Sequence, residues 1–234
     1  MAPGMDVDSP RDTPVERPRP LLVRKALTQD ATPLPPPNPD AKWARKVRKA
    51  KRRIRSELSV NAGDWSRRRY AHDPTLLSAQ GIVDTLPRVH GPNLKPTTFA
   101  DTYERPRLPV ILTGLLDEWP AAMWTFDSFR SEYGDVKFKL GTDDDGYPVR
   151  IKYKYYDDYR RSVEAAEDDS PLYMFEGSMA DRDGQRDILE AYTVPRMFRE
   201  DLFQHVGEGR RPPYKWVVMG PPRSGASLHI DPLR

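Results

Sequence analysis

Apolar positions along the chain predict a series of short strands separated by turns and helices. A continuous aliphatic run predicts a buried strand at 109–113, and period-two alternation predicts half-buried strands elsewhere. The predicted strands are 109–113, 136–140, 149–153, 172–175 and 216–219. Strands dominate the second half of the chain. This order favours an α+β or mainly β domain, antiparallel or barrel-like, over alternating βαβ units.

Helical spacing and end signals predict short helices between these strands. Thr125 is placed to cap a helix over 126–133 that ends at Gly134. Further helices are predicted at 97–103, 155–166, 187–192 and 198–205. We expect these helices to decorate the strands.

A basic amphipathic helix precedes this region. Residues 42–55 hold nine Lys or Arg residues and no acid, and Asp40 is placed to cap the helix. Its apolar residues recur at helical spacing: Trp43, Val47, Ala50, Ile54 and Leu58. We interpret residues 42–60 as a basic helical arm, whose residues 42–55 would contact RNA or a nuclear-import receptor such as importin. The alternative is a solvated helix that packs its apolar stripe on the domain.

The first 41 residues contain 10 of the 25 prolines. The run Pro33 to Pro39 favours polyproline II, and few large apolar residues accompany it. We predict that residues 1–41 form a disordered proline-rich tail, either a linker or a ligand for a proline-recognition domain. Residues 61–234 then form the globular part.

Composition narrows the class of protein. The chain has no cysteine, which excludes a disulfide scaffold, a zinc finger and a thiol nucleophile. No apolar run approaches the ~20 residues that span a bilayer, and the acidic N-terminus does not fit a secretory signal. We therefore expect no membrane partner. The net charge of +3 divides into −1 for residues 1–41, +9 for residues 42–55 and −5 for residues 56–234.

His229 and Asp231 are the candidate metal ligands. Residues i and i+2 of a strand point to one face, so this imidazole and carboxylate would converge. With a second histidine they would form a 2-His-1-carboxylate triad, which leaves positions open on Fe(II). The three-residue pattern is weak by itself, and a surface histidine beside a turn aspartate is the alternative.

Longer stretches resemble a known family. Residues 210–225 and 228–233 closely resemble the jumonji-C oxygenases, and among them the bifunctional arginine demethylase and lysyl-hydroxylase group. Other matching stretches are 64–65, 143–147, 154–156, 168–175 and 201–204. The resemblance covers residues 44–233 and leaves out only the proline-rich head.

The resemblance implies a double-stranded β-helix, a cupin-like barrel that binds Fe(II) and 2-oxoglutarate. His229 and Asp231 would be iron ligands, and Tyr173 would line the 2-oxoglutarate pocket. The implied reaction is lysyl hydroxylation or arginine N-demethylation. The implied substrates are basic segments of nuclear proteins, including histones and splicing factors, and the implied compartment is the nucleus.

The sequence departs from the family pattern near its end. Ala226 stands where the family usually has a threonine that helps to hold 2-oxoglutarate, and Ser227 replaces a glycine. The family continues beyond residue 233 to a distal iron histidine and a lysine that binds 2-oxoglutarate. We therefore expect residues 61–234 to be the N-terminal part of a jumonji-C domain, a barrel incomplete at its C-terminus, with little activity alone. The alternative is a catalytically incomplete nuclear module that binds RNA or protein.

Overall fold

A computed structural model describes residues 41–61, 63–210, 215–226 and 229–230. The predicted proline-rich tail and the Asp40 cap lie outside these residues. The basic helix begins instead after Ala41, which makes no side-chain capping bond. No helix in the described ranges is long and apolar enough to cross a bilayer.

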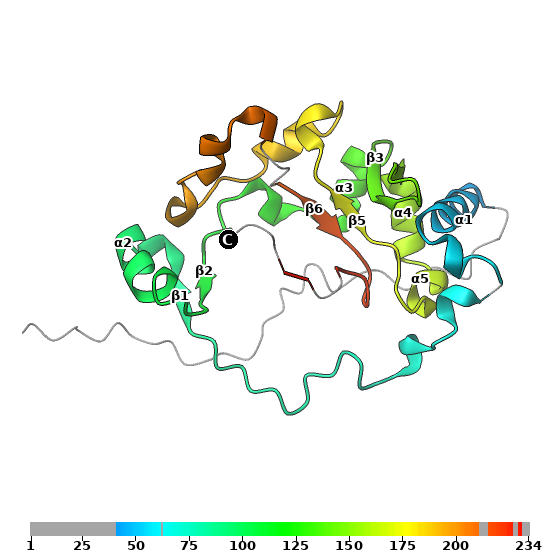
Figure 1. Ribbon diagram of the computed structural model, residues 1–234, viewed down its shortest axis with the longest axis horizontal. Coiled ribbons are helices and arrows are strands. Elements are labelled where there is room, and N and C mark those ends of the chain that lie inside the picture. Colours follow the sequence, from blue (N-terminus) through cyan, green and yellow to red (C-terminus); the bar gives the residue numbers. More distant parts are fainter. Residues whose placement is uncertain (1–40, 62, 211–214, 227–228, 231–234) are drawn as a thin grey trace, which may run out of the picture.

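Short helices and strands alternate along the chain (Figure 1). The α-helices are α1 (Lys42–Ile54), α2 (Pro96–Phe99), α3 (Phe126–Tyr133), α4 (Tyr153–Arg160) and α5 (Val163–Glu167). The strands are β1 (Arg88–His90), β2 (Ile111–Thr113), β3 (Lys137–Thr142), β4 (Pro148–Lys152), β5 (Met174–Glu176) and β6 (Val217–Met219). A π-helical turn, η5 (Ala100–Glu104), continues α2. The 3-10 helices are η1 (Ser56–Leu58), η2 (Asp64–Ser66), η3 (Tyr70–His72), η4 (Gly91–Asn93), η6 (Pro120–Met123), η7 (Met179–Asp181), η8 (Arg186–Glu190), η9 (Arg196–Phe198), η10 (Leu202–Val206) and η11 (Glu208–Arg210).

The described strands pair into three two-stranded sheets. β1 and β2 are parallel, whereas β3 pairs with β4 and β5 with β6 in antiparallel register. Figure 1 shows β5 and β6 between the α1–α4 side of the molecule and the β1–β2–α2 side. These sheets agree with an α+β domain. The complete double-stranded β-helix stays a prediction.

Sequence periodicity located most of the elements, with several differences. β1 was not predicted, and the helix predicted over 198–205 is divided into the separate 3-10 helices η9 and η10. The predicted helix over 155–166 is broken, because the Ser162 hydroxyl accepts a hydrogen bond from the backbone N–H of Ala165 and caps α5 as a separate helix. The strand predicted as buried at 109–113 shortens to β2, which is only partly buried. The Thr125 cap of α3 is confirmed, with Ser128 completing a capping box.

The hydrophobic core lies among α1, α3, α4 and the β3–β4 pair. Val47 and Ala50 of α1 are buried in it, so the basic helix packs on the domain through its apolar stripe. Aromatic rings fill the centre: the Phe129 ring lies 4.6 Å from that of Tyr133 and 4.8 Å from that of Tyr153. Such ring pairs add to simple burial. The core therefore fixes α4 against α1, α3 and the β3–β4 pair.

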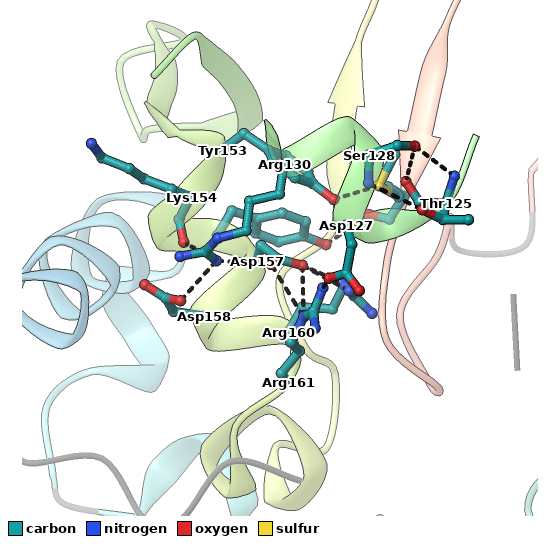
Figure 2. Close-up of polar contacts among 12 residues, drawn as sticks. Thr125, Asp127, Ser128, Arg130, Tyr153, Lys154, Asp157, Asp158, Arg160 and Arg161 are labelled. Carbon is teal, nitrogen blue, oxygen red and sulfur yellow. Dashed lines mark hydrogen bonds and ion pairs between the residues drawn. The ribbon is translucent and has the colours of Figure 1, made fainter. Parts of the chain in front are cut away.

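A buried carboxylate joins α3 to α4. Asp157 is fully buried and accepts hydrogen bonds from the guanidinium groups of Arg130, Arg160 and Arg161 (Figure 2). Arg130 also contacts Asp158 at 2.8 Å. Arg160 stacks over the Phe126 ring at 3.5 Å. This network sets the position of α4 relative to α3.

Candidate functional site

The candidate site lies where β5 and β6 meet the turn that leads toward His229. In the antiparallel register Phe175 is opposite Val218, and Met174 is opposite Met219. Side chains alternate between the faces of a strand, so one face belongs to the core and the other does not. Met174 and Glu176 are fully buried on the core face, whereas Phe175 and Val218 are exposed.

Tyr173 belongs to the face turned away from the core. It precedes β5, and its ring lies 6.1 Å from that of Phe175 in an edge-on arrangement. The Phe175 ring in turn lies 6.1 Å from that of Trp216. We call Tyr173, Phe175, Trp216 and Val218 the open face. Tyr173 is thus placed on an aromatic surface rather than in the core.

The backbone at Gly220 passes so close to Tyr173 that there is no room for a side chain at Gly220. A Cβ at Gly220 would stand 2.9 Å from the Tyr173 Cβ and 2.0 Å from the Ser224 Oγ. The Ser224 hydroxyl donates a 2.6 Å hydrogen bond to the Pro221 carbonyl, which closes the turn after β6. The sequence Gly220-Pro221-Pro222 therefore turns the chain sharply beside Tyr173.

Arg223 anchors this turn to the segment that follows α5. Its guanidinium donates hydrogen bonds to the carbonyls of Ala166 and Asp168, the latter at 3.2 and 3.4 Å. These carbonyls lie at the end of α5, where helical acceptors need outside donors. Sequence analysis treated Arg223 only as part of the stretch 210–225, because no local pattern marks a contact with a residue 55 positions away.

The same segment is held from its other side by the basic helix. Lys51 of α1 is buried, and its Nζ lies 2.5 Å from Asp168 Oδ2 and 2.6 Å from Glu164 Oε1. The Tyr159 hydroxyl donates a 2.6 Å hydrogen bond to Asp168. Burial raises the pKa of Asp168, against the opposing effect of Lys51 and Tyr159. Lys51 was predicted only as part of a charged surface.

Tyr156 supports the strand ends from α4. Its hydroxyl donates to the Met219 carbonyl at 2.7 Å and contacts the Leu172 carbonyl at 3.3 Å. Burial raises the pKa of Tyr156 far above its ordinary value, so the hydroxyl keeps its proton. One phenol therefore links the residue before Tyr173 to the last residue of β6.

Apolar pockets flank β6. One of about 580 Å³ is lined by Trp119, Trp124, Phe126 and Gly220, among others. A second of about 310 Å³ shares Trp119 and Trp124 and includes Trp216 and Lys215. Sequence reasoning noted the two tryptophans only as loop residues. Their presence in a loop with other apolar residues was the available signal for these pockets.

The predicted metal ligands are only partly described. His229 lies after the turn in an irregular segment rather than in a strand, and its neighbour Ile230 is 80% exposed. Asp231 lies outside the described residues, so the convergence of the two side chains stays a prediction. Within the described ranges no three His, Asp or Glu side chains gather as a metal site.

Relatives identify the family. The chain is 43% identical over 190 residues to the bifunctional arginine demethylase and lysyl-hydroxylase psr-1 of Caenorhabditis briggsae, covering 81% of this chain and 46% of that protein. It is 47% identical over 151 residues to psr-1 of Caenorhabditis elegans, covering 64% of this chain and 37% of that protein. The arginine-specific demethylase JMJ22 of Arabidopsis thaliana is 39% identical over 151 residues, which are 64% of this chain and 27% of JMJ22. No family model matches.

The chain belongs to the jumonji-C oxygenase family. Within that family it belongs to the group of psr-1, the bifunctional arginine demethylases and lysyl-hydroxylases. The chain spans less than half the length of the two psr-1 proteins.

Proposed function

We propose that the chain acts as an Fe(II)- and 2-oxoglutarate-dependent protein oxygenase in the nucleus. Its reaction would be lysyl hydroxylation, or N-demethylation of methylarginine, in basic segments of proteins such as histones and splicing factors. The observation that carries the proposal is the similarity to the two psr-1 proteins, whose names give both activities. The acidic balance of residues 56–234 suits a basic peptide.

The donor set fits the metal by its chemistry. His229 and Asp231 would hold Fe(II) through an imidazole nitrogen and a carboxylate oxygen, a pair that suits this ion. When bound, Fe(II) with 2-oxoglutarate and O2 supplies the oxidation, in which 2-oxoglutarate becomes succinate and CO2 and one oxygen atom enters a C–H bond of the substrate. On a methylarginine the hydroxylated methyl group then leaves as formaldehyde.

Side chains of the protein would bind 2-oxoglutarate and orient the target lysine or arginine. Tyr173 would donate its phenolic hydrogen to a carboxylate of 2-oxoglutarate. Phe175 and Trp216, on the open face, would contact the aliphatic part of the target lysine or arginine and exclude water there. Arg223 and Tyr156 fix the turn and strand ends that carry these groups.

Turnover of the purified chain tests this proposal. With Fe(II), 2-oxoglutarate and a peptide bearing lysine and methylarginine, we expect a low rate of succinate formation that exceeds the iron-free control, in line with the little activity expected of the chain alone. The gain of one oxygen atom on lysine or the release of formaldehyde should accompany it. His229→Ala should abolish both products. His205→Ala is the matched control, because His205 is an exposed histidine in η10 and should be neutral.

A folded chain that forms no succinate would contradict the oxygenase proposal. It would favour the alternative of a nuclear binding module. Equal succinate from the wild type and His229→Ala would show that His229 is not an iron ligand.

A further inference from the structure

Every exposed position of α1 and of its C-terminal cap is basic. The inner positions Val47, Ala50 and Lys51 are buried. The exposed positions are Lys42, Arg45, Lys46, Arg48, Lys49, Arg52, Arg53 and Arg55. We call these eight residues the basic face. We propose that the basic face binds the phosphate backbone of nucleic acid, a function beyond the proposed oxygenase activity.

Much of this charge is available to a ligand. Arg53 pairs with Asp143 at 2.5 Å. Lys42, Lys46, Lys49 and Arg52 have no carboxylate within ion-pair distance among the described residues. Folding keeps these like charges together on one helix, where they repel one another at i and i+4 spacing. A polyanion relieves that repulsion and releases its counterions on binding.

The length of the helix matches a run of phosphates. Its 13 residues extend about 20 Å. Duplex nucleic acid carries one charge per ~1.7 Å of axis, so several phosphates face a helix of this length. Trp43, the aromatic residue of α1, packs against the core. Base stacking by α1 is therefore not expected, and binding should depend little on sequence.

The packing of α1 favours nucleic acid over the other acidic partners. An import receptor that takes the segment as an extended peptide requires α1 to unfold and to expose Val47, Ala50 and the Lys51 ion pairs. An anionic membrane surface also attracts basic residues, but stable anchoring needs a second, apolar contribution, and the apolar face of α1 is covered by the domain. Phosphates need only the exposed charges, which the folded helix presents.

Fluorescence anisotropy of the full chain tests the proposal. The probes are labelled single-stranded oligouridylate and a labelled DNA duplex, each of about 20 units, titrated between about 50 and 200 mM salt. The variant combines Lys42→Gln, Lys46→Gln, Lys49→Gln and Arg52→Gln. It should bind RNA at least ~10-fold more weakly at low salt, and the slope of log K against log salt should fall by about 3. The two probes show whether single strands or duplexes are preferred.

A matched control removes four charges elsewhere. Lys95→Gln, Arg105→Gln, Arg107→Gln and Arg199→Gln alter exposed residues at or near the ends of α2, η5 and η9, and α2 contacts both η5 and η9. Figure 1 shows α2 on the opposite side of the molecule from α1. This control should keep wild-type affinity within about twofold, since its charges lie far from the proposed contact. The double variant Lys49→Gln/Arg52→Gln, which perturbs α1 less, should show about half the change in slope.

Three outcomes would overturn the proposal. The first is unchanged affinity for both probes in the fourfold variant with α1 intact by circular dichroism. The second is loss of binding to importin-α with nucleic-acid affinity retained, which would assign the face to nuclear import. The third is binding to anionic lipid vesicles but to neither probe. Succinate formation is measured separately, so failure of the oxygenase proposal leaves this test intact.

Discussion

Lys51 is a buried lysine on a helix whose exposed positions are all basic, and its replacement is the sharpest test of how α1 docks. Lys51→Met keeps the apolar stem and removes the ammonium that contacts Asp168 at 2.5 Å and Glu164 at 2.6 Å. Asp168 is then left buried with Tyr159 as its hydrogen-bond donor. Removing one partner of a buried pair costs about 3–5 kcal/mol, and Glu164 is partly exposed, so we expect about 3 kcal/mol.

The loss should depend on pH. Burial already raises the pKa of Asp168, and without Lys51 that pKa rises further. A carboxyl group whose folded pKa is raised stabilises the protein while it is protonated, and that contribution disappears as pH rises through the folded pKa. The gap between wild type and Lys51→Met should therefore be smaller near pH 5 than near pH 8.

Urea unfolding followed by tryptophan fluorescence measures both quantities. Lys49→Met is the matched control, because Lys49 is exposed on the same helix and should change stability by less than about 0.5 kcal/mol. A loss below about 1 kcal/mol for Lys51→Met, equal at both pH values, would refute the docking argument.

Two further substitutions test the support of the site. Asp157→Asn should lower the free energy of unfolding in urea by about 3–5 kcal/mol, because three guanidinium groups then face a neutral amide. Asp158 is partly exposed, so the control Asp158→Asn should cost about 1 kcal/mol or less. Equal losses for the two variants would contradict the proposed role of the buried network. Gly220→Ala should cost about 1–3 kcal/mol, because its Cβ would collide with Ser224 and Tyr173, whereas Gly209→Ala enters open space and should stay within about 0.5 kcal/mol. An unchanged free energy of unfolding for Gly220→Ala would show that the position of Tyr173 does not depend on the close approach of the backbone at Gly220.

Local patterns in the sequence predicted the local structure. Thr125 was correctly placed as the cap of α3, and alternation located β3 and β4, because capping and strand periodicity depend on neighbouring residues alone. β1 was missed, since Arg88–His90 contains a single aliphatic residue and is a strand only through its pairing with β2. Pairing partners far apart in sequence leave no local pattern.

The candidate site shows the same limit. The resemblance to a known family predicted Tyr173 and His229 as site residues. It did not predict the contacts that position the segments around them. Lys51 had the pattern of a surface charge until its pairs with Glu164 and Asp168 were known. Arg223 lies 55 residues from the carbonyl of Asp168 that it contacts. Such long-range polar contacts depend on the folded arrangement, which periodicity does not contain.

Docking of α1 and the shape of the candidate site share one segment. Lys51 holds the side chain of Asp168, and Arg223 holds its backbone carbonyl, so the basic helix and the turn after β6 meet at one residue. Changes that undock α1 should therefore disturb both the basic face and the turn that leads to His229. Changes confined to the exposed charges should weaken nucleic-acid binding and leave the turn intact. Comparing Lys51→Met with the fourfold glutamine variant thus separates the structural role of α1 from the proposed binding role of its basic face.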